Sequence, residues 1–180
     1  MIKRPALPIY HPASFLATWF GSGLIRKAPG TWGSLAALPC GWALLAFGGR
    51  WVLVGAIVLV FFLGLWAAGL YARALGGVED PGEIVIDEVA GQWIAVLAIA
   101  LSPMKPYLFS YGAAFLLFRL FDIWKPWPVG TLDRKLKGAL GIMADDIAAG
   151  LYAAIFCILL FGAFGYGGLW QAVMTTGSEG

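Results

Sequence analysis

Five carboxylates, placed at the ends of three separate apolar segments, are the side chains of this sequence best suited to chemistry. Asp87 and Glu88 begin one segment, Asp122 ends another, and Asp145 and Asp146 begin a third. All five offer hard oxygen ligands, and the single histidine stands elsewhere, so the set suits Mg²⁺, Mn²⁺ or Ca²⁺ better than zinc. Because neighbouring residues of a helix point about 100° apart, we expect one member of each adjacent pair to bind a metal ion. The other member would bridge to a second ion or hold water.

A simpler explanation accounts for part of this pattern. An acid near the start of a helix is stabilised by the helix dipole and by free backbone N–H groups, which would explain either adjacent pair. Asp122 is different, because it ends its segment at the negative end of the dipole and therefore needs a cation. Arg119, three residues before it, and Lys125, three residues after it, are local candidates. Neither ion pair explains why four further carboxylates converge on one level, so we favour the metal site.

The composition indicates a membrane protein. Hydrophobic residues make up 61% of the chain and charged residues 12%, against about 45–50% and about 25% in soluble domains. Nine tryptophans in 180 residues fit the enrichment of this residue at membrane interfaces. The net charge of +2 is too small to indicate nucleic-acid binding. Cys40 and Cys157 each lie in an apolar run, where we expect them to pack as small hydrophobic residues.

The apolar segments predict an all-α, polytopic membrane helix bundle with four or five transmembrane helices. A helix needs about 20 apolar residues to cross the hydrocarbon core. Residues 1–174 are expected to form a single membrane-embedded domain, and residues 175–180 a flexible tail. The segment at 34–48 contains Pro39 and is either a full crossing or re-entrant. The predicted spans are residues 34–48, 51–72, 84–101, 107–124 and 141–164.

Lysine and arginine collect on one side of these predicted spans, and cytoplasmic loops carry the excess of such residues. With five spans and a cytoplasmic N-terminus, only Arg50 and Lys105 fall on the outer side. All five carboxylates then lie at the cytoplasmic side of the membrane. The cations on that side are Lys3, Arg4, Arg26, Lys27, Arg73, Lys125, Arg134, Lys135 and Lys137.

The stretch GSGLIRKAPGTWGSLAALP, at residues 21–39, predicts a glycine- and proline-rich cytoplasmic loop that can bind phosphate. Glycine lets backbone N–H groups approach an anion, and the start of the following helix adds a favourable dipole. Gly30, Thr31, Ser34 and the cation Lys27 are the candidate contacts. An interfacial loop with snorkelling cations explains these residues equally well, and the spacing of a Walker loop is missing.

Arg119 is the most informative residue of a third stretch, FRLFDIWKPWPVG, at residues 118–130. It lies about one turn inside the predicted membrane boundary, where a buried arginine must pair with Asp122 or with a bound anion. The sequence slightly favours the pairing with Asp122. Trp124 and Trp127 are interpreted as interface anchors, and Pro126 is expected to end the helix.

Four blocks in this order make the chain resemble the phosphatidylglycerophosphatase A family: GSGLIRKAPGTWGS, IVIDEVAGQW, FRLFDIWKPWP and GIMADDIAAG. The resemblance covers about residues 20–152. It implies a bacterial inner-membrane, Mg²⁺-dependent lipid phosphatase that converts phosphatidylglycerophosphate to phosphatidylglycerol, the precursor of cardiolipin. The substrate would be a phosphorylated anionic phospholipid taken from the bilayer, and water would attack its phosphate monoester with assistance from the metal.

On this interpretation the residues divide into two sets. Catalysis and metal binding fall to Asp87, Glu88, Asp122, Asp145 and Asp146. Substrate binding falls to Gly30, Thr31, Ser34, Arg119, Lys125 and Lys27.

Other functions fit less well. Phosphatases that use histidine, a Cys-x₅-Arg loop or the D-x₂-D-G-x₂-A-R signature lack their motifs here. An ion-coupled or proton-coupled transporter is the rival from another class, because intramembrane acids often mark ion paths. Acids at one boundary argue against it, since transporter sites favour the midplane. The sequence leaves open the number of metal ions, a water or an aspartyl-phosphate mechanism, the selectivity among lipid phosphates and the oligomeric state.

Overall fold

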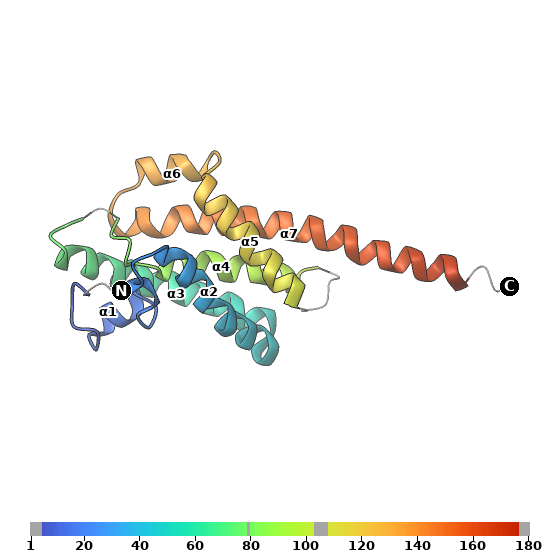
Figure 1. The fold of residues 1–180 in the computed structure, drawn as a ribbon, viewed down its shortest axis with the longest axis horizontal. Coiled ribbons are helices and arrows are strands. Elements are labelled where there is room, and N and C mark those ends of the chain that lie inside the picture. The colour runs from blue at the N-terminus through green and yellow to red at the C-terminus, as the bar shows by residue number, and fades with distance from the viewer. Residues whose placement is uncertain (1–4, 79, 103–107, 177–180) are drawn as a thin grey trace.

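The computed structural model of the chain describes residues 5–78, 80–102 and 108–176, and the side chains only as far as Ala163. These residues form helices and no β-strand, so the predicted all-α class is confirmed. The helices are α1 (Pro12–Ala17), η1 (Ser22–Leu24), α2 (Pro29–Ala43), η2 (Leu44–Gly48), α3 (Gly49–Ala74), α4 (Ile86–Ala100), α5 (Leu108–Trp124), α6 (Val129–Lys135) and α7 (Gly138–Thr176) (Figure 1).

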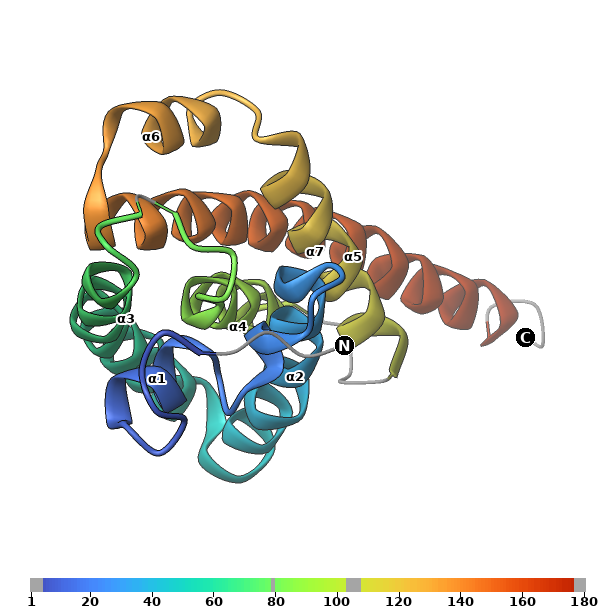
Figure 2. The same cartoon turned by 60° about the vertical axis from the view of Figure 1, so that its left-hand side comes forward.

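Helix α4 is the centre of the bundle. Twelve of its fifteen residues are buried, and helices α2, α3, α5 and α7 all contact it. Figure 2 shows it nearly end-on, with these four helices around it. A helix that is apolar on every side must be enclosed in this way, and the two acids in its first turn are therefore enclosed with it.

Glycines set the closest approach in the bundle, between α4 and α7. A Cβ atom at Gly150 would lie only 2.5 Å from the carbonyl oxygen of Gly91 and 2.8 Å from its Cα atom. Only glycine fits on both sides of such a contact, which is the usual way for membrane helices to pack closely. Gly91 lies one turn beyond Asp87 and Glu88, and Gly150 lies one turn beyond Asp146. The crossing therefore fixes the separation of these acids.

Helix α2 starts beside the first turn of α4. Pro29 occupies the first helical position of α2, where its missing N–H costs no hydrogen bond. A Cβ atom added at Gly33 would lie 2.6 Å from the Cβ atom of Val85, so a side chain there would collide with Val85. Further along, the Trp93 indole Nε1 donates a 2.9 Å hydrogen bond to the carbonyl of Ala37. Gly49, with φ of 73°, then separates the π-helical turn η2 from α3.

Two helical stretches are long and apolar enough to cross a membrane, Pro29–Ala74 and Gly138–Ala163. They are consistent with a membrane protein, and exposed large apolar side chains such as Trp51, Phe62 and Ile155 suit contact with lipid. Helices α4 and α5, with 15 and 17 residues, are shorter than a typical span. The predicted count of four or five crossings therefore remains a prediction.

All the predicted apolar segments are helical, with shifted ends. Figure 1 shows α7 extending well beyond the other helices, and it reaches Thr176, two residues into the predicted tail. Lys3, Arg4, Lys105 and the last four residues of that tail lie outside the described residues.

Candidate metal and phosphate site

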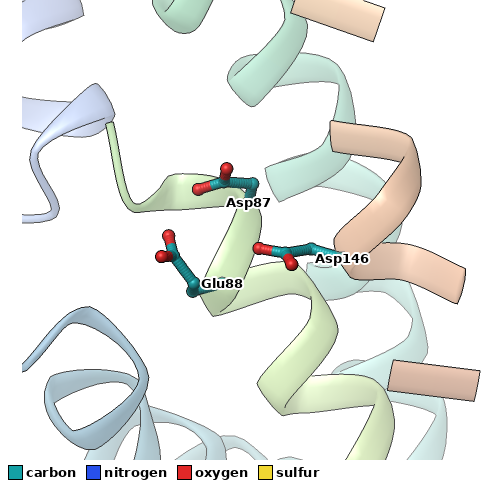
Figure 3. A group of neighbouring side chains, drawn as sticks. All are labelled: Asp87, Glu88 and Asp146. Atoms are coloured by element: carbon teal, nitrogen blue, oxygen red, sulfur yellow. The ribbon is translucent and has the colours of Figure 1, made fainter. Parts of the chain in front are cut away.

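Three carboxylates meet where α4 and α7 cross. Each of Asp87, Glu88 and Asp146 offers an oxygen, and these oxygens lie within 4.8 Å of one another. Figure 3 shows the three side chains bordering a common space, two from the first turn of α4 and one from α7. Residues more than fifty positions apart thus form one group, as the metal hypothesis requires.

The burial of this group favours a cation. Asp87 is 8% exposed and Asp146 is 4% exposed. Among the residues that the structure describes, Asp87 Oδ1 and Glu88 Oε2 are buried without a hydrogen-bond partner. Buried carboxylate oxygens without partners are costly, because the protein must replace the water they lose. An all-oxygen group with orphaned atoms fits a hard divalent cation.

Arg119 connects this group to helix α2. Its guanidinium Nη1 lies 2.5 Å from Asp122 Oδ2 and 3.9 Å from Glu88 Oε1. It also donates a 3.4 Å hydrogen bond to the Ser34 hydroxyl, which in turn donates to the carbonyl of Gly30 at 2.8 Å. Pairing with Asp122, which the sequence slightly favoured, is therefore present, yet the buried Nε of Arg119 finds no partner in the described part of the chain. The Nε–H group of Arg119 therefore remains available to donate a hydrogen bond to a bound anion.

Gly30 is required at this point of α2. A Cβ atom there would collide with the Glu88 carboxylate and lie 3.1 Å from Arg119 Nη1. The absence of a side chain therefore lets the start of α2 contact both the acidic group and the arginine.

Lys125 connects the end of α5 to α6 and α7. It adopts a left-handed conformation with φ of 47°, which ends α5 just before Pro126. Its Nζ atom donates to Asp133 at 2.7 Å and to Asp145 at 2.8 Å. Burial lowers the pKa of the Lys125 ammonium, but these two carboxylates outweigh burial and raise the pKa above its usual value. Lys125 is therefore a permanent positive charge beside the acids.

A cavity of about 190 Å³ opens over these groups. Its walls include Gly30 and the backbone around Gly138 and Gly141, which leave room for a ligand between α2 and α7. Its charged lining consists of Asp80, Asp87, Glu88, Asp122, Lys125, Asp133, Lys137, Asp145 and Asp146. A cavity that combines carboxylates with cations suits a metal ion together with a phosphate group.

The structure sorts the five predicted carboxylates into two groups. All five predicted carboxylates line the cavity, although Asp122 and Asp145 pair with Arg119 and Lys125 while the other three form the compact group. Both members of the Asp87–Glu88 pair contribute an oxygen to that group, whereas only Asp146 of the Asp145–Asp146 pair does.

The predicted phosphate contacts also divide. Gly30, Ser34, Arg119 and Lys125 lie at the cavity or contact residues that do. Thr31 and Lys27 are not part of its lining, and Lys27 is exposed.

Two acids of the cavity were missed by sequence reasoning. Asp80 lies in the connection between α3 and α4, and Asp133 lies in α6. Both lie outside the apolar segments predicted from the sequence. The spacing of eight residues between Lys125 and Asp133 was the available signal, because a short helix after the turn at Pro126 can bring the two together.

Comparison with known proteins decides the relationship. The family model described as phosphatidylglycerophosphatase A matches residues 15–161, a range that contains every residue of the compact acidic group. The chain belongs to the phosphatidylglycerophosphatase A family. The site described above is thus the acidic site of a member of this family.

Individual relatives cover most of the chain. A phosphatidylglycerophosphatase A of Escherichia coli is 40% identical over 154 residues, which are 85% of this chain and 86% of the relative. The protein of the same name in Haemophilus influenzae is 42% identical over 149 residues, covering 83% and 88%. A Bacteroides thetaiotaomicron protein named "Putative phosphatidylinositol-3-phosphatase" is 40% identical over 161 residues, covering 86% and 94%. No solved structure matches the chain.

Proposed function

We propose that this chain hydrolyses the phosphate monoester of phosphatidylglycerophosphate, giving phosphatidylglycerol and inorganic phosphate. The observation that carries the proposal is the buried group of Asp87, Glu88 and Asp146 in a member of this family. The relatives' names share one chemistry, the removal of a phosphate monoester from a phospholipid headgroup. Two of the three name phosphatidylglycerophosphate as the substrate class, which is why we place it first.

The compact acidic group would hold Mg²⁺, with Asp122 and Asp145 available in the same cavity for a second ion or for water. When bound, the cation neutralises charge on the phosphate and on the departing alkoxide. Burial where α4 and α7 cross shields Asp87 and Asp146 from bulk solvent. A free carboxylate of the cavity can accept the proton of the attacking water.

The residues around Arg119 would bind the phosphate. The guanidinium offers its unpartnered Nε, and Lys125 offers a fixed positive charge at the cavity wall. The Ser34 hydroxyl holds the guanidinium in place from α2. Charge-assisted hydrogen bonds of this kind both orient the phosphate and stabilise the charge that develops on its oxygens.

We further propose that the protein lies in the bacterial cytoplasmic membrane with this site at the cytoplasmic face. Arg73 lies in the last turn of α3 beside the start of α7, and Arg134 and Lys135 end α6 just before α7 begins, whereas Arg50 lies at the other end of α3. Excess positive charge marks the cytoplasmic side. The acids lie at one end of the helices and not at their middle, which does not favour a transport path.

Phosphate release from purified protein in detergent tests this proposal. The substrates are phosphatidylglycerophosphate, phosphatidylinositol 3-phosphate and phosphatidic acid, each with Mg²⁺ and with excess EDTA. We expect Mg²⁺-dependent release that is fastest from phosphatidylglycerophosphate. Asp146→Asn should abolish it, whereas the control Lys135→Gln, at an exposed position of α6, should not. EDTA-insensitive release would contradict the metal site, and a preference for another lipid would contradict the substrate.

A further inference from the structure

A second hollow lies on the other side of α2 from the α4 contact, between α2 and α5. It has a volume of about 500 Å³ and is lined by Leu35, Leu38, Pro39, Trp42, Leu108 and Tyr111. Five of the six are apolar, and Tyr111 is largely buried. We refer to these six residues as the α2–α5 groove.

The groove begins next to the proposed phosphate-binding residue Ser34 along α2. Leu35 follows Ser34 in the chain, and Ser34 accepts the hydrogen bond from Arg119 that joins α2 to α5. Tyr111 lies eight residues before Arg119, about 12 Å away along a helix that rises 1.5 Å per residue. Trp42 lies a similar distance from Ser34 along α2. The same two helices therefore hold the polar residues at one end and the groove at the other.

We propose that the α2–α5 groove binds an acyl chain of the lipid substrate while the headgroup phosphate reaches Arg119. This inference rests on the proposed function. A lipid phosphate has an anionic group and an apolar chain joined by a short glycerol unit, and the helix pair presents a cation and an apolar groove in the same order. The match in both charge and direction is what assigns the groove to the substrate.

The groove would act by positioning the lipid substrate and not by strengthening its binding. Lipid tails are as apolar as the groove, so moving a chain from the bilayer into the groove gains little from the hydrophobic effect. An acyl chain held along α2 fixes the position of the lipid headgroup. Precise placement of the reacting group can change rates by orders of magnitude. We therefore expect the groove to affect kcat/KM for the lipid and not the chemistry of the isolated headgroup.

The opposite face of α2 supplies a matched control. Another apolar hollow, separate from the α2–α5 groove, lies on that face. It is lined by Cys40, Ala43, Leu44, Phe47, Gly48, Val52 and Trp93. None of these residues adjoins Ser34 or Arg119. A tryptophan at Ala43 therefore places the same large side chain on α2 as a tryptophan at Leu38, but outside the α2–α5 groove.

The test compares Leu38→Trp with Ala43→Trp on two substrates, long-chain phosphatidylglycerophosphate and its deacylated, water-soluble headgroup. We expect Leu38→Trp to lower kcat/KM for the lipid at least tenfold and to change that for the headgroup less than twofold. Ala43→Trp should change both less than twofold. Equal losses in the two variants, or no loss in Leu38→Trp, would overturn the assignment of the groove.

A cross-linking measurement gives an independent readout. A non-hydrolysable phosphonate analogue with a diazirine in its acyl chain should label peptides of α2 and α5, and Leu38→Trp but not Ala43→Trp should reduce the labelling. Labelling spread evenly over the lipid-facing helices would show bulk lipid in the groove and overturn the inference. Failure of the wild-type protein to release phosphate from the lipid would instead refute the proposed function.

Discussion

Substitution of Gly150 by alanine tests whether the crossing of α4 and α7 builds the proposed metal site. The added Cβ would lie 2.5 Å from the carbonyl oxygen of Gly91, and ordinary contacts begin at about 3.4 Å. The two backbones must therefore separate by about 0.9 Å. Asp146 lies four residues before Gly150, so its carboxylate moves away from Asp87 and Glu88 by a similar amount.

A displacement of this size matters because the ligand geometry of Mg²⁺ is strict. Mg²⁺ requires oxygen distances near 2.0–2.1 Å, with a tolerance of about 0.2 Å. A misplacement of about 1 Å commonly costs on the order of 100-fold in rate, while overpacking a membrane core costs about 1–3 kcal/mol of stability. We expect Gly150→Ala to lower kcat about 100-fold and to raise the Mg²⁺ concentration needed for half-maximal activity.

The assay is phosphate release across a Mg²⁺ titration, together with the thermal unfolding midpoint in detergent. Gly162→Ala is the control, since it lies in the same helix and its Cβ would meet nothing within 4 Å. It should keep normal activity and normal Mg²⁺ dependence. If the folded Gly150→Ala protein matches this control in both respects, the close contact of α4 and α7 does not position the acids.

Three further outcomes are expected. Removal of Mg²⁺ with EDTA should lower the thermal unfolding midpoint, because an ion at 100 times its Kd stabilises the folded state by about 2.7 kcal/mol. If the midpoint does not change when Mg²⁺ is added back, Mg²⁺ does not bind the folded chain. Lys125→Met should lower activity at least tenfold but cost only about 1 kcal/mol of stability, because its ion pairs are partly exposed; phosphate release and unfolding measurements check both, and normal activity would exclude Lys125 from phosphate binding. Lys27→Ala should leave kcat within twofold and raise KM for anionic vesicles only at low salt, because Lys27 is exposed away from the cavity; a lower kcat at every salt concentration would place Lys27 in the site.

Much of the architecture was predictable because apolar runs in a chain of this composition have few alternatives. A backbone in an apolar environment must satisfy its own hydrogen bonds, which favours helices, and the five predicted segments are all helical. The helix that the sequence predicted to begin at Ser34 begins at Pro29 in the structure. That shift follows from proline at the first helical position, a signal present in the sequence and not used for the boundary.

The site was predictable in part. The acids stood out because a carboxylate at the end of an apolar helix requires a reason, and all five line one cavity. The pairing of Arg119 with Asp122 followed from their spacing of three residues. Asp80 and Asp133 were not found, because residues between helices reach the cavity only through the way in which the helices are arranged.

The amino-acid order therefore determined the kind of protein, its helices and the residues able to bind a cation, since each of these depends on local composition and on periodicity. The tertiary structure decided which acids share a space. Asp146, and not Asp145, joins Asp87 and Glu88, because the glycine contact between α4 and α7 fixes the rotation of one helix against the other. That rotation depends on the packing of residues about sixty positions apart, which no local pattern contains.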